Sequence, residues 1–246
     1  MIDIHCHILP LTDDGAASWE IAGQMCDLAI ADGITHIVAT PHANSRYRYD
    51  RGVHAKQLAS LREQSQGKLQ FSLGCDFHLS YENLELLFAD PRGFVIGDTS
   101  YLLIELSEYS LPPAFEQLLF RMKTELRITP ILTHPERYTQ LQRSPEKIAS
   151  WIEAGCLVQI TANSLTGDWG RRAKDMAVWL LQKKLVHIVA TDAHDTKHRP
   201  PKLSAARDFV AAKIGAEAAT ALVETNPRIV VENGPAASLF WAPAAK

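Results

Sequence analysis

The chain has 246 residues, 46% of them hydrophobic, which is enough to bury the core of one large domain. Its 25 basic and 28 acidic residues give a formal net charge of −3, which argues against a nucleic-acid binder that relies on phosphate contacts. The opening residues lack the pattern of a signal peptide, and no apolar stretch reaches the roughly 18 residues of a membrane span. We therefore expect a cytoplasmic protein that binds no nucleic acid and does not insert into a membrane.

Strands and helices are predicted to alternate along most of the chain. Short β-branched or apolar runs predict seven strands, at Ile2–His5, Ile34–Thr40, Leu69–Cys75, Tyr101–Leu106, Thr129–Thr133, Cys156–Ile160 and Val186–Thr191. Segments with helical periodicity predict helices at Ser18–Ala31, Ala55–Gln66, Ala114–Leu126, Pro145–Ala154, Arg171–Lys183, Leu203–Lys213 and Glu217–Glu224. Gly33 and Gly155 stand where helix C-cap glycines belong, and Tyr81–Thr99 is expected to be less regular.

Seven parallel strands with crossover helices fit either a barrel or an open, doubly wound sheet, and the pattern alone does not separate the two. No repeat or Pro/Gly-rich linker divides the chain, so residues 1–234 are expected to form a single α/β domain. The Ala- and Pro-rich residues 235–246 are expected to form a loosely packed tail.

Ionisable side chains recur at the ends of the predicted strands. His5 and His7 flank Cys6, and side chains two apart on a strand share a face, so both imidazoles can reach one ion. A lone pair of this kind is weak evidence, but five later strands each end in or carry His, Asp or Glu. These further candidates are His42, Asp76, Glu105, His134, Asp192 and His194. Active sites of parallel α/β folds assemble at this carboxyl end.

Divalent cations explain why so many ionisable groups converge, because burying them without a counterion would be very costly. Asp13 and Asp14, after the first strand, offer a further carboxylate, which brings the candidates to nine. Nine ligands exceed what one tetrahedral zinc uses, so two or three ions are expected. One or two of the nine are expected to orient other ligands instead of binding metal.

Two arginines follow predicted ligands closely. Arg137 comes three residues after His134, and Arg199 comes five residues after His194, so both are candidates for binding phosphate through the planar guanidinium. By contrast, Trp169 is expected to pack against the fold, and Arg172 to belong to a solvated helix start. The run Arg46–Tyr49 after His42 is as consistent with an ordinary loop as with the mouth of a substrate site.

Several other catalytic classes are excluded by the motifs that the sequence lacks. No Cys has an Arg six residues later, so the signature of thiol phosphatases is missing. There is no GxxxxGK[ST], no GxGxxG and no GxSxG, which removes the signatures of NTP-binding loops, dinucleotide folds and serine hydrolases. The four cysteines are scattered and are expected to be free, mostly buried thiols.

Five motifs of the chain resemble those of the polymerase-and-histidinol-phosphatase (PHP) superfamily. They are the opening Met-Ile-Asp-Ile-His-Cys-His-Ile-Leu-Pro, the Asp-Asp-Gly-Ala that follows, and the later Ala-Thr-Pro-His, His-Pro-Glu-Arg and Thr-Asp-Ala-His. They look most similar to its bacterial protein tyrosine phosphatases, the capsule and exopolysaccharide regulators of the CpsB/YwqE type. The resemblance implies a distorted, TIM-like (β/α)7 barrel with three metal ions, usually manganese. It also implies that Arg137 and Arg199 bind phosphate and that the substrate is a phosphorylated tyrosine autokinase. The ligands that it implies are His5, His7, Asp14, His42, Glu105, His134, Asp192 and His194.

Asp76 departs from the family pattern, which usually has Glu at this position. The shorter side chain leaves open whether it bridges two ions and whether manganese, iron or zinc is preferred. Two other functions remain open: a small-molecule phosphatase with a substrate such as histidinol phosphate, and a regulatory protein that binds metal without turnover.

Overall fold

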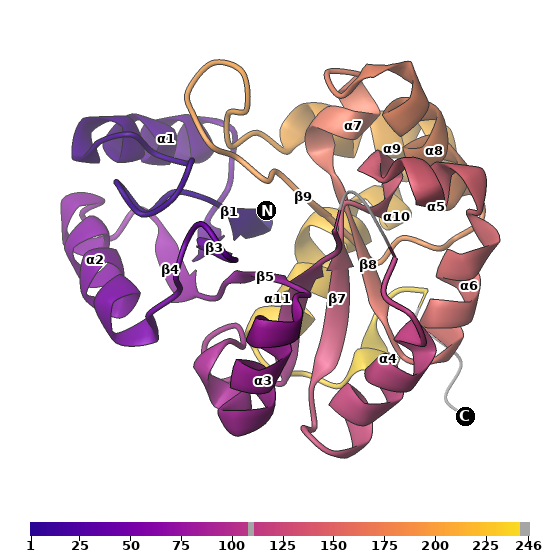
Figure 1. The fold of residues 1–246 in the computed structure, drawn as a ribbon. Helices are drawn as coiled ribbons and strands as arrows, with labels where there is room; N and C mark the ends of the chain where they lie inside the picture. The colour runs from indigo at the N-terminus through magenta and orange to yellow at the C-terminus, as the bar shows by residue number, and fades with distance from the viewer. Residues whose placement is uncertain (108–110, 242–246) are drawn as a thin grey trace.

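Parallel strands ringed by helices form a barrel in the computed structural model, which describes residues 1–107 and 111–241 (Figure 1). The strands are β1 (Ile2–Cys6), β2 (His36–Ala39), β3 (His42–Ala43), β4 (Gln70–Leu73), β5 (Asp76–His78), β6 (Tyr101–Glu105), β7 (Thr129–Thr133), β8 (Leu157–Thr161) and β9 (Ile188–Ala190). They form two sheets, β1-β2-β4 and β3-β5-β6-β7-β8-β9, in which every pairing is parallel.

Nine strands correspond to the seven that the sequence predicts, because two of the predicted strands are each divided by a short break. Pro41, which has no N–H to donate, lies between β2 and β3, and Gly74 and Cys75 lie between β4 and β5. The barrel closes where β1 meets the chain after β9: Asp192 N donates to His5 O, and His7 N donates to Ala193 O, both at 2.8 Å. The predicted distorted (β/α)7 barrel is confirmed, and the open sheet is ruled out.

The longer helices are α1 (Trp19–Ala31), α2 (Arg51–Gln64), α3 (Tyr81–Ala89), α4 (Phe115–Thr124), α5 (Thr139–Arg143), α6 (Glu146–Glu153), α7 (Ala162–Thr166), α8 (Gly170–Gln182), α9 (Ser204–Ile214), α10 (Ala216–Thr220) and α11 (Asn226–Val231). The described residues also form three 3-10 turns, η1 (Pro91–Gly93), η2 (Pro135–Arg137) and η4 (Ala236–Ser238), and a five-residue π-helix, η3 (Ala221–Thr225). Within residues 1–107 and 111–241, none of these helices has the length and apolarity needed to cross a bilayer.

Helix boundaries follow the capping signals of the sequence. Gly33 and Gly155 adopt φ angles of +86° and +98°, as expected for residues that end helices in the left-handed region. The prediction for Tyr81–Thr99 is wrong in its first half, because Ser80 caps α3 by accepting a hydrogen bond from Asn83 N at 3.2 Å.

The C-terminal segment covers the barrel at the amino ends of the strands. Val230 and Leu239 join a buried cluster with strand residues such as Leu103, and Leu239 is only 5% exposed. Asn226 accepts a hydrogen bond from Phe240 N at 2.8 Å. Leu239 and Phe240 therefore pack against the barrel, contrary to the expectation of a loosely packed tail, whereas Pro235, Ala237 and Ser238 are exposed. Residues 242–246 lie outside the described residues. This packing leaves the opposite end of the barrel for the candidate site.

Candidate metal centre

All nine predicted ligands meet at the carboxyl end of the barrel. The two central imidazoles belong to His5 and His7, whose Nε2 atoms lie 3.2 Å apart in a fully buried environment. Asp192 faces both, with Oδ1 at 3.3 Å from His5 Nε2 and at 3.4 Å from His7 Nε2. The shared face predicted for the His-Cys-His motif is therefore present in the structure.

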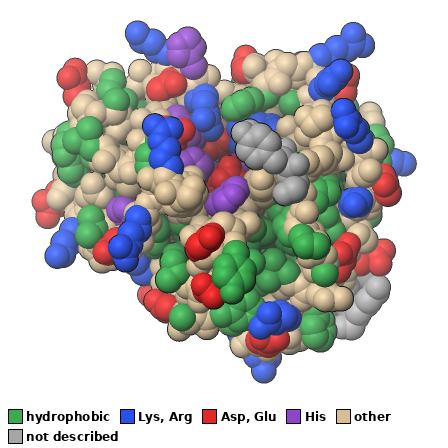
Figure 2. Space-filling view, in the orientation of Figure 1, with side chains coloured by type: hydrophobic (Ala, Val, Ile, Leu, Met, Phe, Trp, Pro, Cys, Tyr) green, Lys and Arg blue, Asp and Glu red, His purple; other side chains and the backbone are tan. Residues whose placement is uncertain are grey.

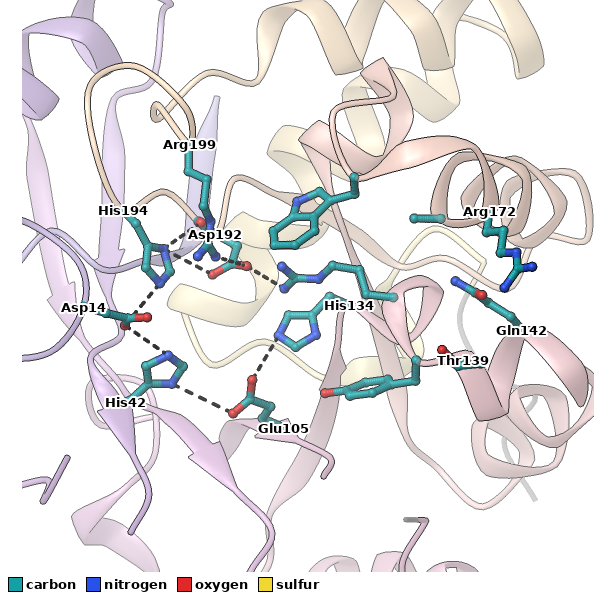
Figure 3. Close-up of a pocket in the computed structure, with 14 residues that line it drawn as sticks. Asp14, His42, Glu105, His134, Thr139, Gln142, Arg172, Asp192, His194 and Arg199 are labelled. Carbon is teal, nitrogen blue, oxygen red and sulfur yellow. Dashed lines mark hydrogen bonds and ion pairs between the residues drawn. The ribbon is translucent and has the colours of Figure 1, made fainter. Parts of the chain in front are cut away.

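The ligand atoms fall into overlapping groups, each close enough to hold a cation. The groups are His7, Asp14, His42 and His194; His5, His134 and Asp192; His5, His7 and Asp76; and His42, Asp76 and Glu105, with the ligand atoms of each within 4.8 Å of one another. Figure 3 shows Asp14 between His42 and His194, and Glu105 between His42 and His134. The overlap places residues such as Asp76 and His42 between neighbouring groups.

Asp76 reaches two of these groups despite its shorter side chain. Its Oδ2 lies 3.3 Å from His42 Nδ1 and 3.7 Å from His5 Nε2. Among the described residues, both Asp76 Oδ2 and His42 Nδ1 are buried without a hydrogen-bond partner. A carboxylate oxygen and an imidazole nitrogen that face one another without hydrogen-bond partners are suited to bind the same cation.

Neighbouring ionisable groups strongly perturb each other's pKa. Burial opposes ionisation of Asp192, but the Arg137 guanidinium and the His5 imidazole hold its pKa well below the usual range. Burial also opposes protonation of His7, yet the Asp13 carboxylate and Asp192 raise its pKa to about 10. Burial and the nearby Asp76 charge raise the pKa of Glu105. Crowded carboxylates and imidazoles of this kind are typical of a site that binds cations.

Two residues orient the central imidazoles by contacting their Nδ1 atoms, on the side of each ring away from the candidate ligand atom Nε2. Gln159 on β8 places Oε1 2.8 Å from His5 Nδ1, and Asp13 places Oδ2 2.8 Å from His7 Nδ1. Asp13 Oδ2 also accepts a hydrogen bond from His42 N at 2.9 Å, so it supports two candidate ligands. Of the two adjacent aspartates, Asp14 reaches a ligand group and Asp13 does not. Metal-bound histidines characteristically have such partners.

Backbone geometry at the site is unusual at two candidate ligands. His134 and Asp192 have φ angles of +37° and +52°, which place them in the left-handed region that non-glycine residues seldom adopt. Glu136 helps to fix the loop after His134, because its buried Oε1 accepts hydrogen bonds from Thr161 N at 2.9 Å and Ser164 Oγ at 2.6 Å. Strained backbone conformations that the surrounding structure keeps in place are concentrated at functional sites.

Both predicted arginines converge on the same carboxylate oxygen. Arg137 Nη2 lies 2.5 Å and Arg199 Nη2 lies 2.6 Å from Asp192 Oδ2, while Asp192 Oδ1 faces the histidines. Both guanidinium groups line the same cavity as the ligands, with Arg137 14% and Arg199 25% exposed in their side chains. The positions predicted for the arginines, beside the ligands, are therefore those found in the structure.

The site opens into a cavity of about 610 Å3. Figure 2 shows histidine, basic and acidic side chains gathered in this central hollow. Trp169 lines the cavity and is 40% exposed, so the expectation that it only packs against the fold is wrong. Arg172 is exposed in the first turn of α8, as predicted, and it also lines the cavity. The pattern gave no signal for either residue, because both lie after β8, where the sequence contains no ligand.

His78 and the first half of the Arg46–Tyr49 run border the site. His78 Nδ1 lies 3.5 Å from Glu105 Oε2, which places this histidine beside the candidate ligands. Tyr47 stacks on His42 with ring centroids 6.1 Å apart, and Arg46 lies over Tyr47. Tyr49 instead packs against His54 and Phe94, so only the first half of this run borders the site.

A parallel α/β barrel with clustered His, Asp and Glu at its carboxyl end is the architecture of a metal-dependent hydrolase. The family model for capsular polysaccharide synthesis proteins, CpsB/CapC, matches residues 1–232. The chain belongs to this family, which confirms the assignment predicted from the motifs.

Named relatives agree with the family assignment. The chain is 32% identical to tyrosine-protein phosphatase YwqE of Bacillus subtilis over 95% of this chain and 92% of that protein. The chain also matches a solved structure with a TM-score of 0.87 and 32% identity over 96% of both chains. That structure belongs to a set of crystal structures of Bacillus subtilis YwqE and Streptococcus pneumoniae CpsB, which are described as metal-dependent tyrosine phosphatases. Histidinol phosphate phosphatase of Lactococcus lactis shares only the fold, with 11% identity and a TM-score of 0.55 over 87% of this chain and 94% of that one.

Proposed function

We propose that this chain is a metal-dependent phosphatase that hydrolyses phosphotyrosine on a protein, with a tyrosine autokinase that controls capsule or exopolysaccharide synthesis as its substrate. The observation that carries the proposal is the convergence of nine candidate ligands in overlapping groups, six of which line one cavity together with the two arginines. Membership of the CpsB/CapC family and the names of the relatives support the tyrosine phosphatase class.

The nine residues His5, His7, Asp14, His42, Asp76, Glu105, His134, Asp192 and His194 would hold two or three divalent ions. Manganese suits this mixture of imidazoles and carboxylates best, and iron or zinc also suits the histidines. Such ions supply activated water at neutral pH and Lewis acidity toward phosphoryl oxygens. Gln159 and Asp13 would keep the His5 and His7 rings in the orientation that leaves Nε2 free for metal.

Arg137 and Arg199 would bind the phosphoryl oxygens that face the cavity. Each has further N–H groups beyond the one donated to Asp192, and among the described residues the buried Arg199 Nε has no hydrogen-bond partner. A phosphoryl oxygen is a suitable acceptor, and the two positive charges would stabilise the charge that develops in the transition state.

A tyrosine leaving group makes hydrolysis easier than an alkyl alcohol would. Free phenol groups of tyrosine have a pKa of about 10, so the oxygen can depart without a strong general acid. The proposal accordingly assigns no general acid to the chain.

The test compares three substrates with purified, manganese-loaded protein whose metal content is measured by mass spectrometry. A phosphotyrosine peptide should give the highest kcat/KM, followed at a distance by a phosphoserine peptide and by histidinol phosphate. Preference for histidinol phosphate would favour the small-molecule phosphatase instead. No turnover of any substrate, with metal bound, would favour a regulatory protein.

The cellular part of the proposal needs separate measurements. Deleting the gene should increase the phosphotyrosine content of the tyrosine autokinase, and wild-type protein should restore it. The predicted cytoplasmic location can be checked by fractionating cells and detecting the protein with an antibody. An unchanged kinase phosphorylation state would contradict the proposed partner while leaving the phosphatase chemistry intact.

A further inference from the structure

Trp169 lies in the loop that joins α7 to α8, after the one predicted strand that carries no candidate ligand. Gly167 and Gly170 flank this part of the loop, with φ angles of +105° and +82°. Gly170 N donates to Gly167 O at 2.9 Å, and this turn holds the tryptophan at the start of α8. The loop thereby places a large aromatic ring on the wall of the cavity that the candidate ligands line.

The two candidate phosphate-binding arginines cover part of this ring. Arg137 Cζ lies 4.3 Å and Arg199 Cζ lies 5.3 Å from the centroid of Trp169, within the range of cation–π contacts. The same two guanidinium groups also contact Asp192 Oδ2, on the side that faces the candidate ligands. The ring is therefore fixed relative to the position where a phosphate would bind, although it is 40% exposed.

This exposure is unusual for a side chain that makes two such contacts. A tryptophan that only packs buries most of its surface, whereas Trp169 keeps part of its ring open at the mouth of a polar cavity. A substrate with its phosphate on the arginines would place the group bonded to the phosphate near this open part of the ring. An aromatic group there could make an offset or edge-to-face contact that an alkyl chain cannot make as well.

We propose that Trp169 is a specificity residue that contacts the aromatic ring of the substrate and so favours aryl over alkyl phosphates. The inference rests on the proposed function and deepens it, because it assigns recognition of the tyrosine ring to one side chain. Trp169 takes no part in bond breaking, and the residues assigned to the metals and the phosphate remain as described.

The test measures binding without turnover. Phenylphosphonate and methylphosphonate both carry the phosphonate group but differ in the ring, and neither is hydrolysed as an ester. Their dissociation constants are measured by calorimetry on manganese-loaded wild-type protein and on the Trp169→Ala, Trp169→Phe and Trp19→Ala variants. Trp19 is a matched control, because it is 38% exposed and lies on α1 beside a different cavity.

We expect wild-type protein to bind phenylphosphonate about 3- to 10-fold more tightly than methylphosphonate, as expected for one aromatic contact. Trp169→Ala should abolish most of this preference, Trp169→Phe should keep most of it, and Trp19→Ala should leave it unchanged. An unchanged preference in Trp169→Ala, with metal content and thermal unfolding like wild type, would overturn the inference. So would an equal loss of affinity for both phosphonates, which would limit Trp169 to supporting the arginines.

Failure of the proposed function can be distinguished from failure of the role of Trp169. If the proposed function is wrong, the wild-type protein would not hydrolyse the phosphotyrosine peptide, whatever its phosphonate preference. Failure of the inference alone would leave wild-type turnover intact, and Trp169→Ala would retain the ratio of kcat/KM between phenyl phosphate and an alkyl phosphate.

Discussion

Gln159 Oε1 lies 2.8 Å from His5 Nδ1, so β8, the strand without a candidate ligand, still contributes to the candidate metal centre. Both side chains are fully buried. The contact fixes the plane of the imidazole, and by accepting a proton from Nδ1 it would leave Nε2 free to bind metal.

Replacing Gln159 with Leu should therefore weaken metal binding without removing a ligand. Loss of such a supporting partner typically reduces metal affinity or activity about 10- to 100-fold. The measurement is manganese affinity by competition with a chelator, alongside circular dichroism. Gln24→Leu, on the exposed face of α1, is the control and should bind manganese like wild type. Equal affinities for Gln159→Leu and wild type would show that His5 needs no partner.

Gly15 is required by the close approach of its loop to His7. A Cβ at this position would lie 2.1 Å from His7 O and 2.6 Å from His7 Cβ, far inside van der Waals contact. Gly15 N also donates to Asp13 Oδ1 at 2.9 Å, so the same loop places the carboxylate that orients His7.

We expect Gly15→Ala to lower the free energy of unfolding by about 1–3 kcal/mol, as overpacking does, and to weaken metal binding. Gly23→Ala is the matched control, since no atom of the surroundings lies within 4 Å of its added Cβ. In the middle of α1, that change should stabilise the protein by about 0.5–1 kcal/mol. Urea unfolding of both variants measures the two effects, and destabilisation of the same size in both would contradict the role of the His7 contact.

The strand-end pattern is sufficient to predict the parallel strands and eight of the candidate ligands, because both depend on local periodicity and on the common end of parallel strands. The barrel and the choice of Asp14 over Asp13 follow only from the resemblance to the PHP superfamily. Gln159 and Trp169 were not predictable in the same way. An amide on a buried strand and a tryptophan near a helix look like ordinary packing residues, and only three-dimensional proximity to His5 and Arg137 reveals their roles. The α3 helix was missed because its nine residues give a short periodic signal.

Arg137→Ala and Arg199→Ala should each reduce kcat/KM for a phosphotyrosine peptide by about 100- to 1000-fold, by analogy with loss of an oxyanion donor. Metal should remain bound, because Asp192 Oδ1 faces the histidines and keeps its position between His5 and His7. Lysine at either position should rescue only part of the activity, since it lacks the planar fork.

Steady-state kinetics and metal content on the same preparations test the role of the arginines. Arg121→Ala is a suitable control, because this arginine is exposed and does not line the cavity; it pairs with Glu125 at the end of α4 and lies over the ring of Phe88. Activity near wild type in both active-site variants would reduce Arg137 and Arg199 to structural partners of Asp192.

Activity should depend on metal and not on any thiol. A chelator should abolish turnover and manganese should restore it, whereas alkylating reagents should leave activity largely intact. All four cysteines are buried, and burial raises the pKa of Cys26 and Cys156 to about 12, which disfavours the reactive thiolate. Loss of activity in proportion to the labelling of one cysteine, with the fold preserved, would contradict this expectation.

His187 should make the protein less stable in acid. It is fully buried, its Nδ1 accepts a hydrogen bond from Val158 N at 3.0 Å, and burial lowers its pKa from 6.5 to about 4. An unfolded chain takes up a proton on this residue near pH 6.5, but the folded protein does so only near pH 4. The neutral histidine therefore contributes full stability above pH 6.5, and this contribution is lost as the pH falls from 6.5 to 4.

A pKa difference of this size corresponds to about 3 kcal/mol across that pH range. His187→Asn removes the titration and keeps a side-chain oxygen that can accept from Val158 N. Urea unfolding of the metal-free protein, measured from pH 7.5 to pH 4, should show a smaller loss of stability in His187→Asn than in wild type. His198→Asn, at an exposed histidine, controls for removal of an imidazole and should follow the wild-type curve. Parallel curves for wild type and His187→Asn would show that other groups cause the acid sensitivity.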